Sequence, residues 1–229
     1  MRRFFWITII VVALVVLAFF SPWRQINIDL AGLFGLEQAE KSSGLAVSSF
    51  AGEMEVYVDG KLEGTATPSV SLFLPKVTPG ERLIKLVRKS EISQAFYSYS
   101  KLLPLVEGSE VQIAYELGPT QDFSGGHVIR AAGSRNNDTS NVRLSVSTAV
   151  TDVEVYLDDA YIGLTPIVNH NLSVSNQHKL ELRKSGYDVQ TFTILPDEQS
   201  ERDRLAGYIL DVTVDMFLRP IDIQFEQTN

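Results

Sequence analysis

The residues with the most obvious capacity for chemistry are the three histidines, His127, His170 and His178. A zinc site needs three or four ligands at defined spacings, and a catalytic triad needs a serine beside a histidine and a carboxylate. The histidine spacing fits no ligand motif, and no GxSxG-like serine accompanies it. We therefore expect the histidines at loops or strand ends on the wet surface, and we predict no catalytic residue, no metal site and no cofactor.

Residues 197–203 carry four carboxylates within seven positions, a composition that could coordinate calcium. The segment lacks the D-x-[DN]-x-[DN]-G framework of a calcium loop and contains an arginine, Arg202. It also falls where a link between two strands is expected. We interpret it as a solvated loop, with calcium binding as the open alternative.

Aromatic residues alternate with small ones at Phe96-Tyr97-Ser98-Tyr99. Rings on the surface of a sheet can stack on sugars or on a peptide, whereas rings on the other face belong to the core. Tyr97 and Tyr99 are therefore our candidate binding surface, and the core interpretation stays open beside it.

Charge and cysteine content narrow the function classes. Subtracting Arg2, Arg3 and Arg24 from the 20 basic residues leaves 17 against 28 acidic ones, so residues 25–229 have a formal charge of −11. Such acidity disfavours nucleic acid as a partner. There is no cysteine, which excludes disulfides, thiolate metal sites and a cysteine nucleophile.

Two parts of the chain resemble each other in sequence. The secondary-structure elements of these two parts must position the histidines, the acidic segment and the tyrosines described above. The landmarks keep their order at offsets of 98 to 101: Leu45 with Leu144, residues 55–59 with 154–158, Thr67 and Pro68 with Thr165 and Pro166, and residues 111–119 with 212–220. Such a pattern indicates two copies of one domain, each of about 75 to 80 residues.

Each copy reads as strands because apolar residues alternate with polar ones. The first copy predicts strands at 45–49, 54–58, 70–74, 83–88, 92–99 and 111–117, and the second at 172–174, 179–183, 189–195 and 208–218. Asp59-Gly60 suits a type I′ hairpin turn, whereas Asp158-Asp159 forms this turn less well and predicts a looser hairpin. The predicted turn residues are Asp59, Gly60, Gly64, Pro68, Asp158, Gly163, Pro166 and Gly186.

Residues 4–20 are apolar except for Thr8. As a helix they would extend ~25 Å, close to the thickness of a hydrocarbon core. Arg2 and Arg3 precede the segment, so the positive-inside rule places the N-terminus in the cytoplasm. Bulky residues before Pro22 fit a cleavage site poorly and favour a retained anchor over a cleaved signal peptide. The anchor residues include Phe4, Phe5, Trp6, Ile7, Leu14, Leu17 and Phe20.

The expected fold is all-β, with two small antiparallel sandwich-like or barrel-like domains in tandem behind one transmembrane α-helix. The parts are a cytoplasmic stub and helix (1–21), a stalk (22–43), a first domain (44–120), a linker (121–141), a second domain (142–221) and a tail (222–229). Residues 127–132 are expected to add an edge strand to the first domain. The apolar half of the stalk either lies on the bilayer or packs on that domain.

These motifs resemble the PEGA family of β-rich repeats. The first copy has the V-Y-V-D-G turn at residues 56–60, Gly64, Thr67-Pro68 and a Pro-Gly bend at 79–80, and the second has V-Y-L-D at 155–158, Gly163, Thr165-Pro166 and Gly186-Tyr187. The first copy lacks the Gly-Tyr pair and the second lacks the Pro-Gly bend. The resemblance implies small β-sandwiches of surface proteins, with no shared catalytic residues.

The sequence thus indicates a single-pass membrane protein whose bulk lies outside the cytoplasm, acting as a non-enzymatic interaction or spacer module of the prokaryotic cell envelope. Its expected partners are the lipid bilayer and an envelope protein or cell-wall glycan, and not nucleic acid. One alternative is an accessory subunit of a membrane protein complex. A hydrolase of envelope polymers is disfavoured, because no catalytic cluster can be traced.

Overall fold

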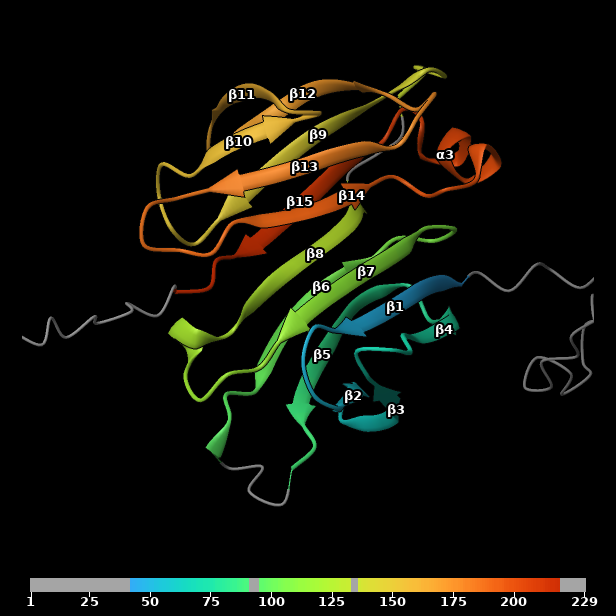
Figure 1. Ribbon diagram of the computed structural model, residues 1–229. Helices are drawn as coiled ribbons and strands as arrows, with labels where there is room; N and C mark the ends of the chain where they lie inside the picture. The colour runs from blue at the N-terminus through green and yellow to red at the C-terminus, as the bar shows by residue number, and fades with distance from the viewer. Residues whose placement is uncertain (1–41, 91–94, 133–135, 219–229) are drawn as a thin grey trace, which may run out of the picture. The chain divides into compact units, whose positions relative to one another are not determined.

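The computed structural model describes residues 42–90, 95–132 and 136–218, and strands are the main regular structure in them (Figure 1). The strands are β1 (Ser43–Ser49), β2 (Met54–Val58), β3 (Lys61–Ala66), β4 (Leu72–Val77), β5 (Gly80–Arg88), β6 (Tyr99–Leu105), β7 (Glu110–Glu116), β8 (Gly125–Ala132), β9 (Asn141–Thr148), β10 (Glu154–Leu157), β11 (Ala160–Leu164), β12 (Ile167–Ser173), β13 (His178–Arg183), β14 (Gln190–Ile194) and β15 (Ile209–Asp215). A 3-10 turn, η3 (Gln121–Phe123), and a short α-helix, α3 (Gln199–Leu205), accompany them. The prediction of a mostly β fold is confirmed.

Within these described ranges, no helix has the length and apolar character that crossing a bilayer would require. The predicted anchor at residues 4–20 and the stalk up to residue 41 lie outside the described part of the chain, as does the predicted tail.

The strands form three sheets. The largest has seven strands in the order β12-β9-β15-β8-β7-β1-β4, and the two smaller sheets are β3-β2-β5-β6 and β11-β10-β13-β14. We call β1–β7 the N-half and β9–β15 the C-half. In each half the first, fourth and seventh strands belong to the seven-stranded sheet, and the other four form the half's own smaller sheet, so the strand order is the same in both halves.

The seven-stranded sheet is mixed, and the expectation of purely antiparallel sheets is wrong at two places. β1 pairs in parallel with β7, and β9 pairs in parallel with β15. Parallel neighbours need a long connection. Here the chain crosses to the smaller sheet and back between the two strands, which supplies that connection.

β8 joins the two halves. It pairs antiparallel with β7 on one side and with β15 on the other, so it lies in the middle of the sheet (Figure 1). The prediction of a strand near residues 127–132 is right, but its placement at an edge is wrong. The physical reason is that β8 has apolar residues on both faces, Val128 and Ile129, and both are buried.

The two hydrophobic cores lie on opposite faces of the seven-stranded sheet. Val128 belongs to the N-half core and Ile129 to the C-half core. Successive residues of a strand point to opposite faces, so the smaller sheet of each half covers a different face. The largest fully buried side chains are Leu45, Met54, Ile84, Leu86, Ile113 and Leu117 in the N-half and Leu144, Leu180, Leu182 and Ile194 in the C-half.

Three local predictions differ from the structure. The strand expected at residues 92–99 begins only at Tyr99, and β6 continues through Pro104 to Leu105, where no strand was predicted. Proline is tolerated there because β6 is the edge strand of its sheet. The segment 197–203, expected as a loop, is largely α3. The hairpin at Asp158-Asp159 is as tight as the one at Asp59-Gly60, with the same register and the same bulge.

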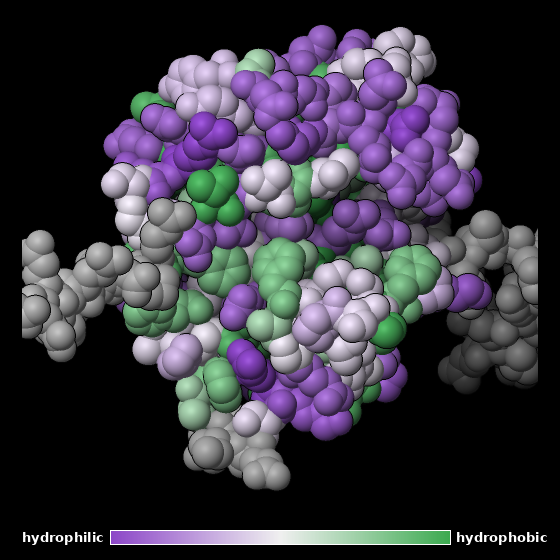
Figure 2. All heavy atoms as spheres, in the orientation of Figure 1, coloured by the Kyte–Doolittle hydropathy of each residue, from purple (hydrophilic) through white to green (hydrophobic). Residues whose placement is uncertain are grey.

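The two halves differ in surface character. In the view of Figure 2, hydrophilic side chains cover most of the surface around α3 and the C-half, whereas apolar ones are scattered over the N-half. Exposed apolar residues of the N-half include Leu62, Phe73, Leu83 and Leu102. Scattered apolar residues are ordinary on soluble surfaces, so they do not by themselves mark a site.

Candidate functional site

The hairpin aspartates Asp59 and Asp158 have the same structural role in the two halves. Both have positive φ, 51° and 48°, as the tight turn requires. The N–H of Leu83 donates to Asp59 Oδ1 at 2.9 Å, and the N–H of Lys179 donates to Asp158 Oδ1 at 2.9 Å. Each carboxylate therefore accepts the bond that a backbone carbonyl would accept if the ladder continued past the turn.

A basic side chain lies beside each of these carboxylates. Arg82 Nη1 donates to Asp59 Oδ2 at 3.1 Å, and His178 Nδ1 lies 2.6 Å from Asp158 Oδ2. The N–H of Leu83 and then Arg82 hold the pKa of Asp59 below its usual value. Burial alone would raise the pKa of Asp158, but the hydrogen bonds from His178 and Lys179 outweigh it and lower the pKa.

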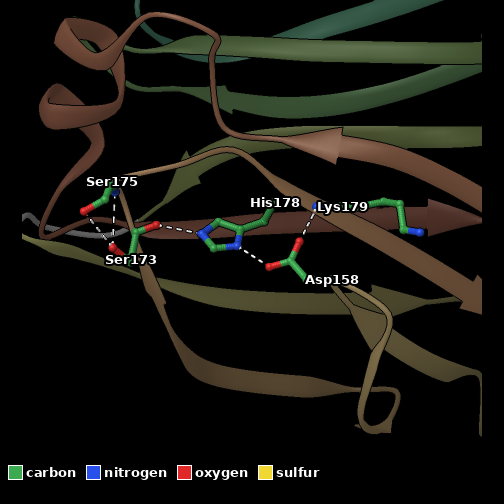
Figure 3. A network of polar contacts seen from close by, with 5 residues as sticks. All are labelled: Asp158, Ser173, Ser175, His178 and Lys179. Atoms are coloured by element: carbon green, nitrogen blue, oxygen red, sulfur yellow. Dashed lines mark hydrogen bonds and ion pairs between the residues drawn. The ribbon is translucent and has the colours of Figure 1, made fainter.

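His178, Asp158 and Ser173 lie in a row that invites comparison with a catalytic triad (Figure 3). His178 Nε2 contacts the backbone carbonyl of Ser173 at 2.9 Å, not its hydroxyl, and Ser173 Oγ is engaged with Ser175 Oγ at 3.1 Å. Both ring nitrogens of His178 thus face oxygen atoms of Asp158 and of the Ser173 backbone, and neither faces the serine hydroxyl. A triad base must instead accept a proton from the serine hydroxyl. The row is a structural clasp of the C-half.

The other two histidines do not belong to this row. His127, in β8, is buried and stacks on Phe192 with ring centroids 3.8 Å apart, and burial lowers its pKa to about 4. His170 is half-buried in β12. The expectation of wet-surface histidines is therefore wrong for His127, because β8 is enclosed on both faces. Throughout the described ranges, no group of three or more His, Asp or Glu side chains is placed to hold a metal ion.

Arg202 explains how the acidic segment is organised. It is buried in α3, and its guanidinium donates to the carbonyls of Val174 at 3.0 Å and Pro196 at 2.8 Å, and to Gln199 Oε1 at 2.7 Å. Further bonds reach the carbonyls of Ser175 and Asp197. The converging oxygens that a calcium ion would need thus already surround the protein's own cation.

The remaining predicted turn residues also have structural settings. A Cβ on Gly64 would lie 2.7 Å from Leu72 Cδ1, so a larger residue would push the Leu72 side chain aside. Gly163, at the matching position beside the bulge of β11, has a φ of 143°. The other predicted turn residues are also at changes of chain direction. Gly60 is in the first hairpin, Pro68 and Pro166 come just after β3 and β11, and Gly186 is in the turn after β13.

A cavity of 380 Å³ lies where the N-half meets the C-half beside β6. We call it the Tyr pocket, because four tyrosines line it: Tyr97, Tyr99, Tyr115 and Tyr187. Asp122 and Asp215 also belong to its wall. Two of these, Tyr97 and Tyr99, are the predicted binding residues, and the structure brings them together here. Tyr99 is not on an open surface as predicted, since it is only 4% exposed.

Polar groups in the Tyr pocket are unevenly satisfied. The ring centroids of Tyr99 and Tyr115 are 4.8 Å apart, and the Tyr115 hydroxyl donates to Asp215 Oδ2 at 2.9 Å. Within the described part of the chain, the buried Tyr99 hydroxyl has no hydrogen-bond partner. Burial and then the negative charge of Asp215 raise the pKa of both phenols. Sequence reasoning missed Tyr115 and Asp215, although a tyrosine within an otherwise aliphatic core strand is a signal that its polar end has a partner.

A second cavity, of 320 Å³, lies on the other face of the seven-stranded sheet, under α3. Its wall includes Gln112 of β7 and Ile129 of β8, which point away from the face that carries Tyr115. Its charged residues, Glu110, Glu201 and Arg204, are mixed in sign. The cavity therefore has less distinctive chemistry than the Tyr pocket.

Comparison with known families finds a match to part of the C-half. Residues 141–203 match the sequence model of the PEGA domain. This segment is a PEGA domain. It begins with β9 and ends within α3, so it holds the Asp158–His178 clasp and Arg202 but leaves out β15. The match spans about a quarter of the chain, and the chain has no significant match among curated proteins.

The PEGA domain contributes only part of the Tyr pocket. Tyr187 comes from it, whereas Tyr97, Tyr99 and Tyr115 come from the N-half, and Asp215 follows the matched segment. The pocket is therefore a property of the joined halves rather than of the PEGA domain alone.

Proposed function

We propose that this chain is a membrane-anchored interaction protein of the prokaryotic cell envelope, with its β-domains outside the cytoplasm and no enzymatic activity. Residues 4–20 would hold it in the bilayer, and the N-half would be a second PEGA-like domain. The observation that carries the proposal is the shared seven-stranded sheet, which makes one continuous scaffold out of two small sandwiches.

The equivalence of the two halves supports a second PEGA-like domain. Both have the same strand order, the same bulged hairpin and the same aspartate bonding at the turn. Asp59 with Arg82 in the N-half matches Asp158 with His178 in the PEGA domain. Shared hydrogen bonding at matching positions is a stronger argument than the alternation of apolar residues, which any strand pair would have.

The use of the polar residues supports a role in binding rather than catalysis. His178, Asp158 and Arg202 are occupied by turn and loop carbonyls or by one another. A catalytic base must be free to approach its substrate's proton. What the scaffold offers to a partner is therefore its loops, its sheet edges and the cavities between the halves.

Location is tested most directly by exploiting the lack of cysteine. Lys61→Cys places one thiol on a side chain that is 76% exposed. In intact cells, with the outer layer permeabilised where there is one, a membrane-impermeant maleimide should label this variant. The protein should also stay in the membrane pellet after an alkaline wash. Labelling only after cell lysis would overturn the proposed location.

Capture of a partner distinguishes binding through the β-domains from binding through the helix and stalk. The full chain in detergent is cross-linked and purified from envelope fractions, beside a variant whose residues 4–43 are replaced by an unrelated anchor. Capture that persists in the variant supports binding through the β-domains. Capture lost in the variant would favour the accessory-subunit alternative, in which contacts are made by the helix and stalk.

A further inference from the structure

The Tyr pocket has the features of a binding site that is filled from outside. Its wall is built by both halves, and its volume of 380 Å³ is within the range of small-ligand sites. Tyr99 is 4% exposed, and its hydroxyl has no partner among the described residues. An unpaired buried hydroxyl weakens folding, so its presence at a cavity wall points to a polar group that enters the pocket.

The charges in the pocket select the sign of that group. Asp215 and Asp122 contribute carboxylates, and among the described residues the carboxylate of Asp215 accepts a hydrogen bond only from the neutral phenol of Tyr115. The pKa of the Tyr99 hydroxyl is raised mainly by burial and, as the second cause, by the negative charge of Asp215. The single cation in the wall, Lys101, is exposed and makes no ion pair within the described part of the chain. An anion would therefore be repelled, and a cation attracted.

The aromatic rings select the kind of cation. Four tyrosines line one cavity, and aromatic faces attract organic cations through their quadrupole. A metal ion would instead need three or more oxygen or nitrogen ligands, a set that the described residues do not assemble. An ammonium on an alkyl chain uses both parts of the wall, because its methylenes lie on the rings while its N–H groups face the carboxylate of Asp215.

We propose that the Tyr pocket binds a primary alkylammonium group, as carried by a lysine side chain of a partner protein or by a free amine. The inference rests on the proposed interaction role and gives it a chemistry. It can fail while the proposed location stands, because binding is measured on purified protein and location in cells.

The test uses the purified full chain in detergent and isothermal titration with four probes. Nα-acetyl-lysine N-methylamide carries the ammonium on a peptide unit, and butylamine carries it free. Nα-acetyl-norleucine N-methylamide is the uncharged match, and an N-acetylglucosamine oligomer represents a glycan. We expect the lysine probe to bind at least about tenfold more tightly than the norleucine probe. Tighter binding of butylamine than of the lysine probe would identify a free amine as the natural source.

Charge variants give the sharpest prediction, since they change affinity in opposite directions. Asp215→Asn should weaken lysine-probe binding at least about threefold, and Lys101→Gln should strengthen it about twofold to threefold, because a like charge is removed. Glu116→Gln is the matched control for Asp215, because it removes a carboxylate from the other face of the same sheet. Lys85→Gln, on β5 outside the pocket, is the control for Lys101. Both controls should leave affinity unchanged.

Several results would overturn the proposal. Equal binding of the lysine and norleucine probes would remove the role of charge. Weaker lysine-probe binding in Lys101→Gln would contradict the expected repulsion between Lys101 and a bound cation, and glycan binding without amine binding would replace the ammonium with a sugar. Circular dichroism melts show whether each variant is folded. If Asp215→Asn proves unfolded, Lys101→Gln alone still tests the sign of the charge effect, because the proposal requires this variant to bind the lysine probe more tightly.

Discussion

The phenol of Tyr115, in β7, donates a 2.9 Å hydrogen bond to the carboxylate of Asp215, in β15. It thereby connects the last strands of the two halves across β8. Tyr99 lies beside Tyr115, and its own hydroxyl has no hydrogen-bond partner among the residues that the structure describes. Two neighbouring buried phenols thus have opposite hydrogen-bonding states.

Removing the two hydroxyls should consequently have opposite effects. Tyr115→Phe should lower the free energy of unfolding by about 1.5 kcal/mol, because a bond to a carboxylate is lost. Tyr99→Phe should raise it by about 1 kcal/mol, because a buried hydroxyl without a partner is removed. Urea unfolding of both variants measures this. A loss of stability in Tyr99→Phe would contradict the unpaired state of its hydroxyl.

The burial of His127 predicts a dependence of stability on pH. Its pKa falls from 6.5 to about 4 on folding, so the unfolded chain binds the proton more readily between these values. The stabilisation is complete above pH 6.5 and is lost as the pH falls towards 4. His127→Phe keeps the stacking on Phe192 without the titration. Between pH 7 and pH 4.5 the unmodified protein should lose about 2 kcal/mol more unfolding free energy than the variant.

Arg202 and Arg204 form a matched pair on α3, one buried and one exposed. Arg202→Leu should cost about 3 kcal/mol, because it leaves the carbonyls of Val174 and Pro196 without a donor. Arg204→Leu should change stability by no more than about 0.5 kcal/mol. Chemical denaturation monitored by far-UV circular dichroism compares the unfolding free energies of the two variants. Equal effects of both substitutions would mean that Arg202 does not organise this loop.

The second hairpin should become more stable when its second turn residue is replaced by the glycine found in the first hairpin. Asp159 has a φ of 66°, a conformation that glycine adopts at less cost, and Gly60 occupies the matching position. Asp159→Gly should raise the unfolding free energy by about 0.5 kcal/mol, although it removes the exposed ion pair with Lys179. Gly60→Asp should lower it by a similar amount. The prediction is wrong if both substitutions shift the melting temperature in the same direction.

β8 should make the two halves unfold together. Val128→Ala and Ile129→Ala alter neighbouring residues that belong to different cores, and each should cost about 2 kcal/mol. In a calorimetric melt of the β-domains both should shift one common transition. Two transitions, each sensitive to only one substitution, would show that the shared sheet does not couple the halves.

Local chemistry made much of the fold predictable. Asp59-Gly60 identifies its hairpin because few dipeptides adopt two positive φ values, and the constant offsets place the equivalent strands. The placement of β8 was not predictable from alternation, because Val128 and Ile129 serve different cores and break the period of two. An unbroken apolar pair in a short strand is itself the signal of burial on both faces.

The Tyr pocket was predictable only in part. Tyr97 and Tyr99 stand two residues apart and draw attention as an aromatic pair. Tyr115, Tyr187 and Asp215 reach the same cavity from distant segments. Their meeting depends on β8 setting the register between β7 and β15, a tertiary relationship that no local pattern encodes.

The directions of the paired strands have a mechanical consequence. β1 runs parallel to β7, and β8 is antiparallel to both β7 and β15, so β1 and β15 point the same way. Tension between Ser43, where β1 begins, and Asp215, where β15 ends, therefore acts along the strands in shear. Under shear, the hydrogen bonds of a ladder share the load and rupture together instead of peeling one by one. A chain pulled at these two ends is thus loaded in the direction in which its ladders are strongest.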